Sequence, residues 1–327
     1  MTPARSWLTR HRRETSVAIA AAVLAVVLAI AAPGFFARDN LSDLFLAALP
    51  VLIVALGATL VILTGNIDIS AGSIFAIAGV ASGLFAKAGL PMPLVVLAAC
   101  AVGAAFGAVN GAMVAYLRIP SIVVTLATMV ALRDGLRWAT DGAWIQNLPD
   151  DFQWLTLTQS SYPFLALAIA LGLTIALAWS LRHLAAGRAI YATGSNREAA
   201  RLAGFDTALV TFAVFVVAGG LTGLAAVLNS VRFNQIPSNA GLGLELKVIA
   251  AVVVGGTAIT GGRGTIAGTV LGVVLLGAVG PALTFLGVSA YWERAIQGAI
   301  ILAAVAIDAI RDRPHAHTVA AGVSTAS

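Results

Sequence analysis

The sequence predicts an all-α polytopic membrane protein with about ten transmembrane helices. Of the 327 residues, 60% are hydrophobic and only 10% are charged, and the mean hydropathy is +0.97. A soluble domain carries about 25% charged residues, so water cannot be the only solvent of this chain. The hydrophobic residues also form long runs, and an α-helix needs about 20 apolar residues to cross a bilayer.

The apolar runs follow one another along most of the chain. We expect the first to stay as a membrane anchor, although Ala29-Ile30-Ala31 is a possible signal-peptide cleavage pattern, because the run is long and more spans follow it. Pro120 and Pro163 lie near span starts, where a missing amide costs little. The expected spans are 16–33, 44–64, 71–86, 93–117, 119–138, 163–181, 208–229, 246–261, 264–287 and 291–310.

The third and eighth spans, 71–86 and 246–261, are short enough to be broken or partly re-entrant helices. Membranes tolerate such breaks only where protein or a water-filled cavity covers the backbone. Residues 65–72 and 255–262 also align with each other, each at the inner end of a span. The sequence therefore suggests an internal repeat of two halves, as in many transporters.

The charges predict the orientation. Placing both termini in the cytoplasm puts most of the 19 Lys and Arg residues inside, as the positive-inside rule requires. These cations stand singly at span ends and form no stripe, which argues against nucleic acid as a partner. We expect one transmembrane domain over 1–310, with a cytoplasmic loop at 182–207 and a disordered tail at 311–327.

Several kinds of chemistry have no candidate residues. We find no ionisable residue in the middle of a predicted span, where a proton- or sodium-coupled carrier usually keeps one. The chain has no phosphate-binding loop with its lysine, no metal-ligand spacing among its four His residues and no Ser/His/Asp set. The sequence thus predicts a protein that is not an enzyme, with no metal site, no cofactor of its own and no catalytic residue.

The segment 187–204 is a charged island between two apolar runs. Ser195 and Glu198 have capping-box spacing, which predicts a helix start, and Gly204 predicts its left-handed stop. A short capped helix on the cytoplasmic face fits a docking surface for a soluble ATPase, although a solvated loop is the alternative. The residues expected to couple are Gly187, Arg188, Tyr191, Gly194, Ser195, Asn196, Arg197, Glu198, Arg201 and Gly204.

Two further groups of polar residues are candidates. Asn66, Asp68 and Ser70 could gate the pathway or contact solute at its inner mouth, or Asp68 and Ser70 could simply cap the next helix. On the outer side, Glu245 and Lys247 are two residues apart and do not face each other on a helix. They could meet a binding protein or another span, or could lie at the interface. Trp144 belongs to an outer segment, 139–160, that could be a lid, a docking face or an aromatic belt.

Four segments occur in one colinear order: 57–73 (GATLVILTGNIDISAGS), 119–128 (IPSIVVTLAT), the island at 187–204, and 241–256 with 261–265. Together they resemble the integral membrane permeases of bacterial ATP-binding-cassette importers for ribose-type sugars, a family that includes ribose, rhamnose and autoinducer-2 systems. The resemblance covers roughly residues 40–310. Segments 137–145 and 236–241 look closer to the rhamnose and autoinducer-2 branches than to ribose.

The resemblance implies a transport complex in the bacterial inner membrane. Its other members would be two cytoplasmic ATPase subunits that bind ATP–Mg, a periplasmic binding protein and a second permease subunit. The transported solute would be of the rhamnose, autoinducer-2 or pentose type. The alternatives are a stand-alone secondary carrier, which would need a buried ionisable residue, and a membrane scaffold without solute flux.

Overall fold

The computed structural model describes residues 12–289, 291–293, 295–296, 298–299 and 302. This part of the chain is all-helical and contains no strand, which confirms that the fold is all-α. The predicted tail at 311–327 and most of the tenth predicted span lie outside the described residues.

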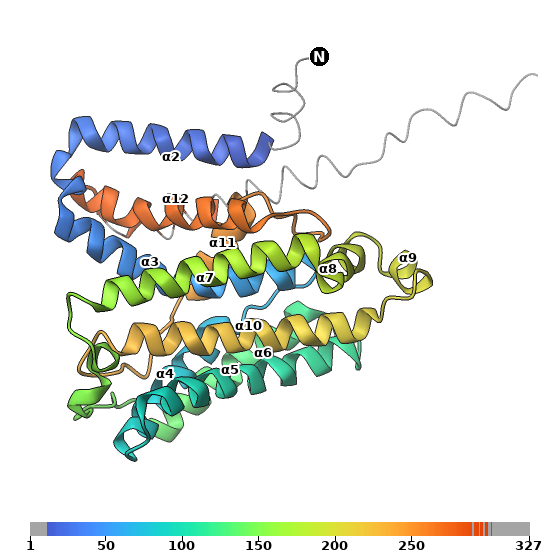
Figure 1. Ribbon diagram of the computed structural model, residues 1–327, viewed down its shortest axis with the longest axis horizontal. Helices are drawn as coiled ribbons and strands as arrows, with labels where there is room; N and C mark the ends of the chain where they lie inside the picture. The colour runs from blue at the N-terminus through green and yellow to red at the C-terminus, as the bar shows by residue number, and fades with distance from the viewer. Residues whose placement is uncertain (1–11, 290, 294, 297, 300–301, 303–327) are drawn as a thin grey trace, which may run out of the picture.

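The helices follow the predicted spans closely (Figure 1). Two short 3₁₀ helices, η1 (Pro33–Phe36) and η2 (Asp150–Thr156), stand between them. The α-helices are α2 (Arg12–Ala31), α3 (Arg38–Leu63), α4 (Ala71–Lys87), α5 (Met92–Ala115), α6 (Ser121–Thr140), α7 (Tyr162–His183), α8 (Ala185–Ser195), α9 (Arg197–Leu202), α10 (Thr207–Ser230), α11 (Leu244–Val254) and α12 (Ile266–Phe285).

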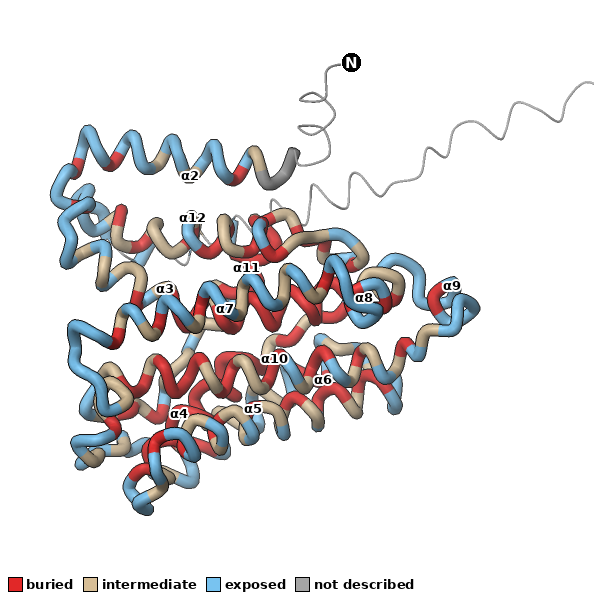
Figure 2. Tube along the Cα trace, viewed as in Figure 1, coloured by how far each residue is buried: buried red, intermediate tan, exposed pale blue. Residues whose placement is uncertain are grey.

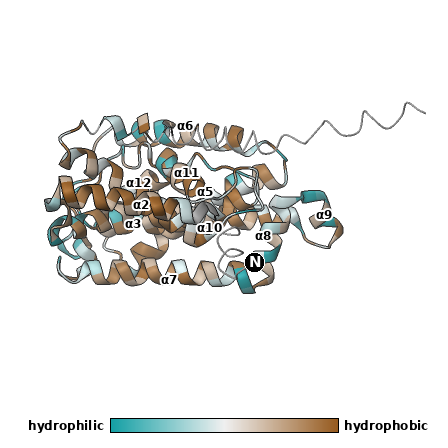
Figure 3. Cartoon of the chain, turned by 90° about the horizontal axis from the view of Figure 1, so that it is seen from above, coloured by the Kyte–Doolittle hydropathy of each residue, from teal (hydrophilic) through white to brown (hydrophobic). Residues whose placement is uncertain are grey.

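By length and composition, five of the described helices can cross a membrane: α3, α5, α7, α10 and α12. Two shorter apolar stretches, Thr15–Ala31 and Ala71–Lys87, accompany them. The structure thus supports several membrane-spanning helices, and the count of ten stays a prediction. Hydrophobic residues cover α7 along its length, and hydrophilic ones gather at the end next to α8 (Figure 3).

The core of the bundle is α3, which contacts α7, α8, α10, α11 and α12. From Leu49 to Leu63 the chain is buried almost without interruption, so α3 is surrounded by protein on nearly every side. In contrast, α2 is exposed along most of its length (Figure 2). An exposed apolar helix is what a membrane protein shows where its outer surface faces lipid.

Glycines let α5 and α10 approach each other closely. A Cβ atom at Gly103 would overlap the carbonyl oxygen of Gly219, and one at Gly107 would overlap that of Phe215. The reverse also holds, because a Cβ at Gly223 would overlap the carbonyl of Ala99. Small residues at four-residue spacing, which the sequence has at Gly103, Gly107 and Gly111, allow such backbone contact. We call this contact the glycine seam.

The eighth predicted span, 246–261, is helical only in its first part, which agrees with the broken helix that its short length allowed. Helix α11 has 11 residues and stops at Val254, whereas the apolar run continues to residue 261. The chain leaves the helix because Gly256, Gly261 and Gly262 adopt positive φ angles of 95°, 88° and 70°, which favour glycine. An apolar run alone could not show that this loop is not helical.

The loop after α11 meets the loop after α3. The amide of Gly262 donates to the carbonyl of Leu63 at 2.9 Å, and a Cβ on Gly65 would lie 3.3 Å from the carbonyl oxygen of Thr260. The two glycine-rich segments that align in the sequence therefore lie side by side. The repeat itself stays a prediction.

Candidate functional site

The island at 187–204 forms two short helices instead of one. Helix α8 ends at Ser195 and α9 begins at Arg197, with Asn196 between them in an extended conformation at φ −158° and ψ 104°. The predicted cap at Ser195 is wrong, because the Asn196 side chain accepts the hydrogen bond from the amide of Ala199 at 2.9 Å. The sequence allows both, since Ser and Asn are equally good N-cap residues.

The predicted stop at Gly204 is confirmed. Gly204 has φ +87°, its amide donates to the carbonyl of Arg201 at 3.0 Å, and the amide of Phe205 donates to that of Ala200 at 3.0 Å. These two bonds are the Schellman pattern. Helix α9 is therefore capped at both ends.

Helix α8 is fixed to the bundle through its glycines and its tyrosine. A Cβ at Gly187 would overlap the backbone of Leu181, and one at Gly194 would overlap the carbonyl of Leu63. The Tyr191 hydroxyl donates to the carbonyl of Gly264 at 2.8 Å. Thus α8 touches the ends of both glycine-rich loops.

Helix α9, in contrast, projects from the end of the bundle (Figure 1). Arg197, Glu198 and Arg201 are exposed, and Leu202 is 85% exposed. Arg188 on α8 is exposed as well. We call the exposed residues 197, 198, 201 and 202 the coupling surface. Leu202, an apolar side chain at the tip of a charged helix, was not among the predicted residues.

A cavity of about 740 Å³ separates α9 from the loop that precedes α4. Its wall includes Arg118, Arg197 and Arg201, and Asn66 also lines it. Ser121 lies on the same wall and accepts a hydrogen bond from the amide of Ile67 at 3.1 Å. The cavity therefore runs from the coupling surface to the segment 66–70.

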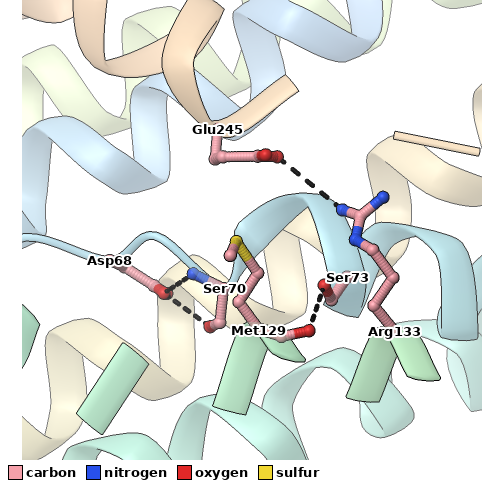
Figure 4. Close-up of polar contacts among 6 residues, drawn as sticks. All are labelled: Asp68, Ser70, Ser73, Met129, Arg133 and Glu245. Carbon is pink, nitrogen blue, oxygen red and sulfur yellow. Dashed lines mark hydrogen bonds and ion pairs between the residues drawn. The ribbon is translucent and has the colours of Figure 1, made fainter. Parts of the chain in front are cut away.

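Segment 66–70 is buried and non-helical, with Asn66, Asp68 and Ser70 each less than one-tenth exposed. One carboxylate oxygen of Asp68 accepts from the Ser70 amide at 2.9 Å and from its hydroxyl at 2.6 Å (Figure 4). Asn66 donates to the Thr64 hydroxyl at 3.0 Å. Ser70 stands at the N-cap position of α4, but its side chain makes no capping bond, and Asp68 binds Ser70 rather than the first turn of α4. The Ser70 side chain therefore does not cap α4, whereas Asp68 binds the Ser70 amide at the start of that helix.

The hydrogen bonds continue from Ser70 into two other helices. Asn110 on α5 donates to the Ser70 hydroxyl at 2.8 Å, and Thr128 on α6 donates to the Asn110 side-chain oxygen at 2.7 Å. Ser73 donates to the backbone carbonyl of Met129 at 2.8 Å (Figure 4). This chain of bonds joins the start of α4 to α5 and α6.

Two ionisable residues meet inside the bundle, although neither lies in the middle of a predicted span. Arg133 on α6 and Glu245 on α11 approach to 3.9 Å, with side chains 18% and 10% exposed. The sequence hides this because Glu245 stands just before an apolar run and Arg133 within the last third of one. Both point toward the start of α4 (Figure 4). We call Asp68, Ser70, Arg133 and Glu245 the polar cluster.

The remaining outer candidates have separate surroundings. Lys247 donates to Glu293 at 2.9 Å, so Glu245 and Lys247 do not pair with each other, as expected. Trp144 is 46% exposed and precedes Ile145, which exchanges two backbone hydrogen bonds with Ile236. These bonds fix the segment beside the chain that follows α10.

The described residues contain no group of three or more His, Cys, Asp or Glu side chains that could hold a metal ion. The arrangement consists of a protruding helix pair, a cavity and a buried polar cluster in a helical bundle. Such parts can bind a partner and a polar solute.

Comparison with known proteins points the same way. A family model described as "Branched-chain amino acid transport system / permease component" matches residues 40–305. The chain is 34% identical over 307 residues to Autoinducer 2 import system permease protein LsrC of Photorhabdus luminescens, a match that covers 92% of this chain and 91% of that protein. It is 39% identical over 297 residues to the protein of the same name from Escherichia coli (strain K12 / DH10B), covering 88% and 85%. No solved structure matches.

Proposed function

This chain belongs to the permease-component family whose model matches residues 40–305, and from that premise we propose that it imports an autoinducer-2-type solute. It is a transport subunit of an ATP-driven importer, and ATP hydrolysis belongs to its partners. The family description names branched-chain amino acids, whereas the relatives are named for autoinducer 2. Since the relatives match over most of their length, we take the solute class from them, with rhamnose-like sugars and then pentoses as the next candidates.

The complete importer, in this proposal, contains two ATPase subunits that bind ATP–Mg, a periplasmic binding protein and a second permease subunit. The chain lies in the bacterial inner membrane with both termini in the cytoplasm. The end of the bundle that bears α8 and α9 faces the cytoplasm, and the end with Trp144 faces the binding protein. Ten spans, arranged as two related halves, are part of the same proposal.

The observation that carries the coupling mechanism is the contrast between the two helices of the island. The ATPase grips α9 through Arg197, Glu198, Arg201 and Leu202, with Arg188 at the edge. Helix α8 passes the displacement on, because it contacts Leu63 through Gly194 and binds Gly264 through Tyr191. Motion of the two glycine-rich loops then changes the packing around Asn66, Asp68 and Ser70 and opens or closes the pathway.

The experiment that tests the function measures ATP hydrolysis. The complex is purified through this chain from its native membrane and reconstituted, and hydrolysis is measured with and without its binding protein and a panel of sugars. Stimulation by one loaded ligand establishes the importer and its solute. If no ATPase co-purifies and flux persists without ATP, the proposal fails.

A charge reversal tests the coupling surface. Glu198→Arg should uncouple ATP hydrolysis from transport while leaving insertion intact, because it reverses a charge on the α9 surface. Arg182→Glu, exposed at the same end of the bundle on α7, is the matched control. Equal behaviour of the two variants would contradict the proposed role of α9.

A stand-alone carrier is the second candidate, because the polar cluster supplies the buried ionisable residues such a carrier needs. It predicts uptake that follows a proton or sodium gradient. If proteoliposomes take up the solute when ATP is present and no ion gradient exists, the stand-alone carrier is excluded.

A further inference from the structure

The Arg133–Glu245 pair lies deep within the bundle. Arg133 is 12 residues after the start of α6, which at 1.5 Å per residue is about 18 Å from the α8–α9 end. Glu245 reaches the same level from the other side, because α11 runs antiparallel to α12, with Gly255 against Gly268 and Ala251 against Gly272. Continuing that register places Glu245 about 18 Å along α12. The pair is thus well inside the bilayer-spanning part.

The two side chains satisfy each other poorly. Their nearest atoms are 3.9 Å apart, which is too long for a hydrogen bond. Within the described part of the chain, Arg133 Nη1 and Nη2 and Glu245 Oε2 are buried without a hydrogen-bond partner. A pair that served only to hold helices together would be expected to make short bonds, since buried charges without them are costly.

Glycine at position 72 leaves room for the two charged side chains. A Cβ on Gly72 would overlap Glu245 Oε2 and lie 3.2 Å from Arg133 Nη2 and 2.5 Å from the carbonyl oxygen of Gly241. Gly241 itself has φ +70°, so glycine is favoured there. One turn before, Asp68 and Ser70 add a carboxylate and a hydroxyl at the start of the same helix (Figure 4).

We propose that Arg133 and Glu245 form a solute contact within the transport pathway, where both bind hydroxyl groups of an uncharged, polyhydroxylated solute. Glu245 and Asp68 would repel an anion, and Arg133 would repel a cation, whereas hydroxyl groups can donate to the carboxylates and accept from the guanidinium. The solute separates α6 from α11 as it enters and replaces one poor ion pair with several charge-assisted hydrogen bonds. This inference rests on the proposed function and adds Arg133 to the pathway.

The test compares two ion pairs that share α11. The double variant Arg133→Met/Glu245→Met removes the proposed contact, and Lys247→Met/Glu293→Met removes a pair of the same charges that lies outside the polar cluster. Replacing both members of a buried pair by apolar residues is often neutral for folding. The first readout is uptake of autoinducer-2 and of a mono-deoxy analogue by reconstituted complexes. The second is the thermal transition of the purified chain. The third is assembly, measured as the molar ratio of this chain to the ATPase in the purified complex.

Loss of hydrogen bonds to charged groups should lower uptake about 10- to 100-fold in the Arg133/Glu245 variant, with wild-type assembly and a smaller preference for autoinducer-2 over the deoxy analogue. The Lys247/Glu293 variant should stay near wild type. Wild-type uptake by the Arg133/Glu245 variant overturns the inference. If that variant fails to assemble, Arg133→Lys decides instead: lowered uptake at normal stability supports the contact, and normal uptake overturns it.

Failure of the proposed function gives a different result. In that case the wild-type complex takes up no autoinducer-2 and its ATP hydrolysis does not respond to the binding protein, before any variant is compared.

Discussion

The glycine seam and the polar cluster hold neighbouring helices together by opposite means. In the seam, Gly103, Gly107, Gly219 and Gly223 remove side chains so that the backbones of α5 and α10 touch. In the cluster, α4, α6 and α11 are joined through a hydrogen bond between Ser73 and Met129 and through a 3.9 Å ion pair. Both regions are buried, yet only the second contains groups that a solute could engage.

This difference suggests how the molecule moves. Backbone contact leaves no freedom to slide without overlap, so we expect α5 and α10 to move as one rigid body. Polar bonds can be exchanged for bonds to a solute or to water, so the cluster can open at small cost. Asn110 is the point where the two regions meet, because it lies on α5 and donates to Ser70.

The largest expected effect comes from filling the seam. Gly107→Leu places a side chain where even a Cβ overlaps the carbonyl of Phe215, and overpacking of this kind costs about 1–3 kcal/mol or more. We expect little folded protein, measured as the monodisperse fraction after detergent extraction.

Gly220→Ala is the control for the seam. Gly220 is next to Gly219, but a Cβ there would lie 3.8 Å from its nearest neighbours, which is ordinary contact. If Gly220→Ala gives the wild-type yield of folded protein and Gly107→Leu gives little, then backbone contact, and not glycine content, defines the seam. Equal yields would remove the distinction between the two regions.

A smaller effect is expected from the cluster, and on transport rather than folding. Asp68→Asn keeps an oxygen that can accept from Ser70 but removes the buried charge. We expect uptake to fall about tenfold, as loss of a charge-assisted bond implies, with an unchanged or higher thermal transition. The transport rate is measured as uptake by reconstituted complexes, and the thermal transition is measured by differential scanning fluorimetry.

Asp206→Asn is the matched change outside the cluster. Asp206 accepts from the amides of Ala208 and Leu209 at 3.0 Å each at the exposed start of α10, and Asn caps a helix as well as Asp. It should transport normally. Normal transport by Asp68→Asn as well would mean that Asp68 only shapes the turn.

The seam could be predicted from the sequence, whereas Asp68, Ser70 and Glu245 were predicted only as separate candidates and not as one cluster with Arg133, for a physical reason. Four-residue glycine spacing within one helix is a local pattern, so Gly103, Gly107 and Gly111 indicate close packing without any knowledge of the partner. The cluster joins residues from α4, α6 and α11, whose sequence separation carries no signal. Arg133 could have been noticed as a charge inside the predicted span 119–138, but its partner could not have been identified.

The island at 187–204 was predicted in outline and wrong in one detail. Its charged helix and its glycine stop were correct, because these depend on neighbouring residues. The division into α8 and α9 at Asn196 was missed, since it depends on the contacts of Gly194 and Tyr191 with distant loops.

A substitution at the division between α8 and α9 should have an effect of moderate size. Asn196→Ala removes the observed cap of α9 and should cost about 1 kcal/mol of local stability, which weakens the link between ATPase and cluster and leaves the seam unaffected. Hydrogen exchange of the α9 amides and the ratio of solute transported to ATP hydrolysed are the measurements. Ser195→Ala, the cap that the sequence suggested, should change neither.

The smallest effect is expected from Lys247 and Glu293, an ion pair that shares α11 with the polar cluster but is more accessible. The pair is 2.9 Å apart, and its side chains are 28% and 24% exposed, so its net contribution should be about 0–1 kcal/mol. Lys247→Met should therefore shift the thermal transition little and leave uptake near wild type. In Glu245→Met, by contrast, Arg133 stays buried without its ion-pair partner, and removing one member of a buried pair costs about 3–5 kcal/mol. Similar losses from both substitutions would show that burial does not distinguish these two pairs, and that Lys247 and Glu293 belong to the polar cluster.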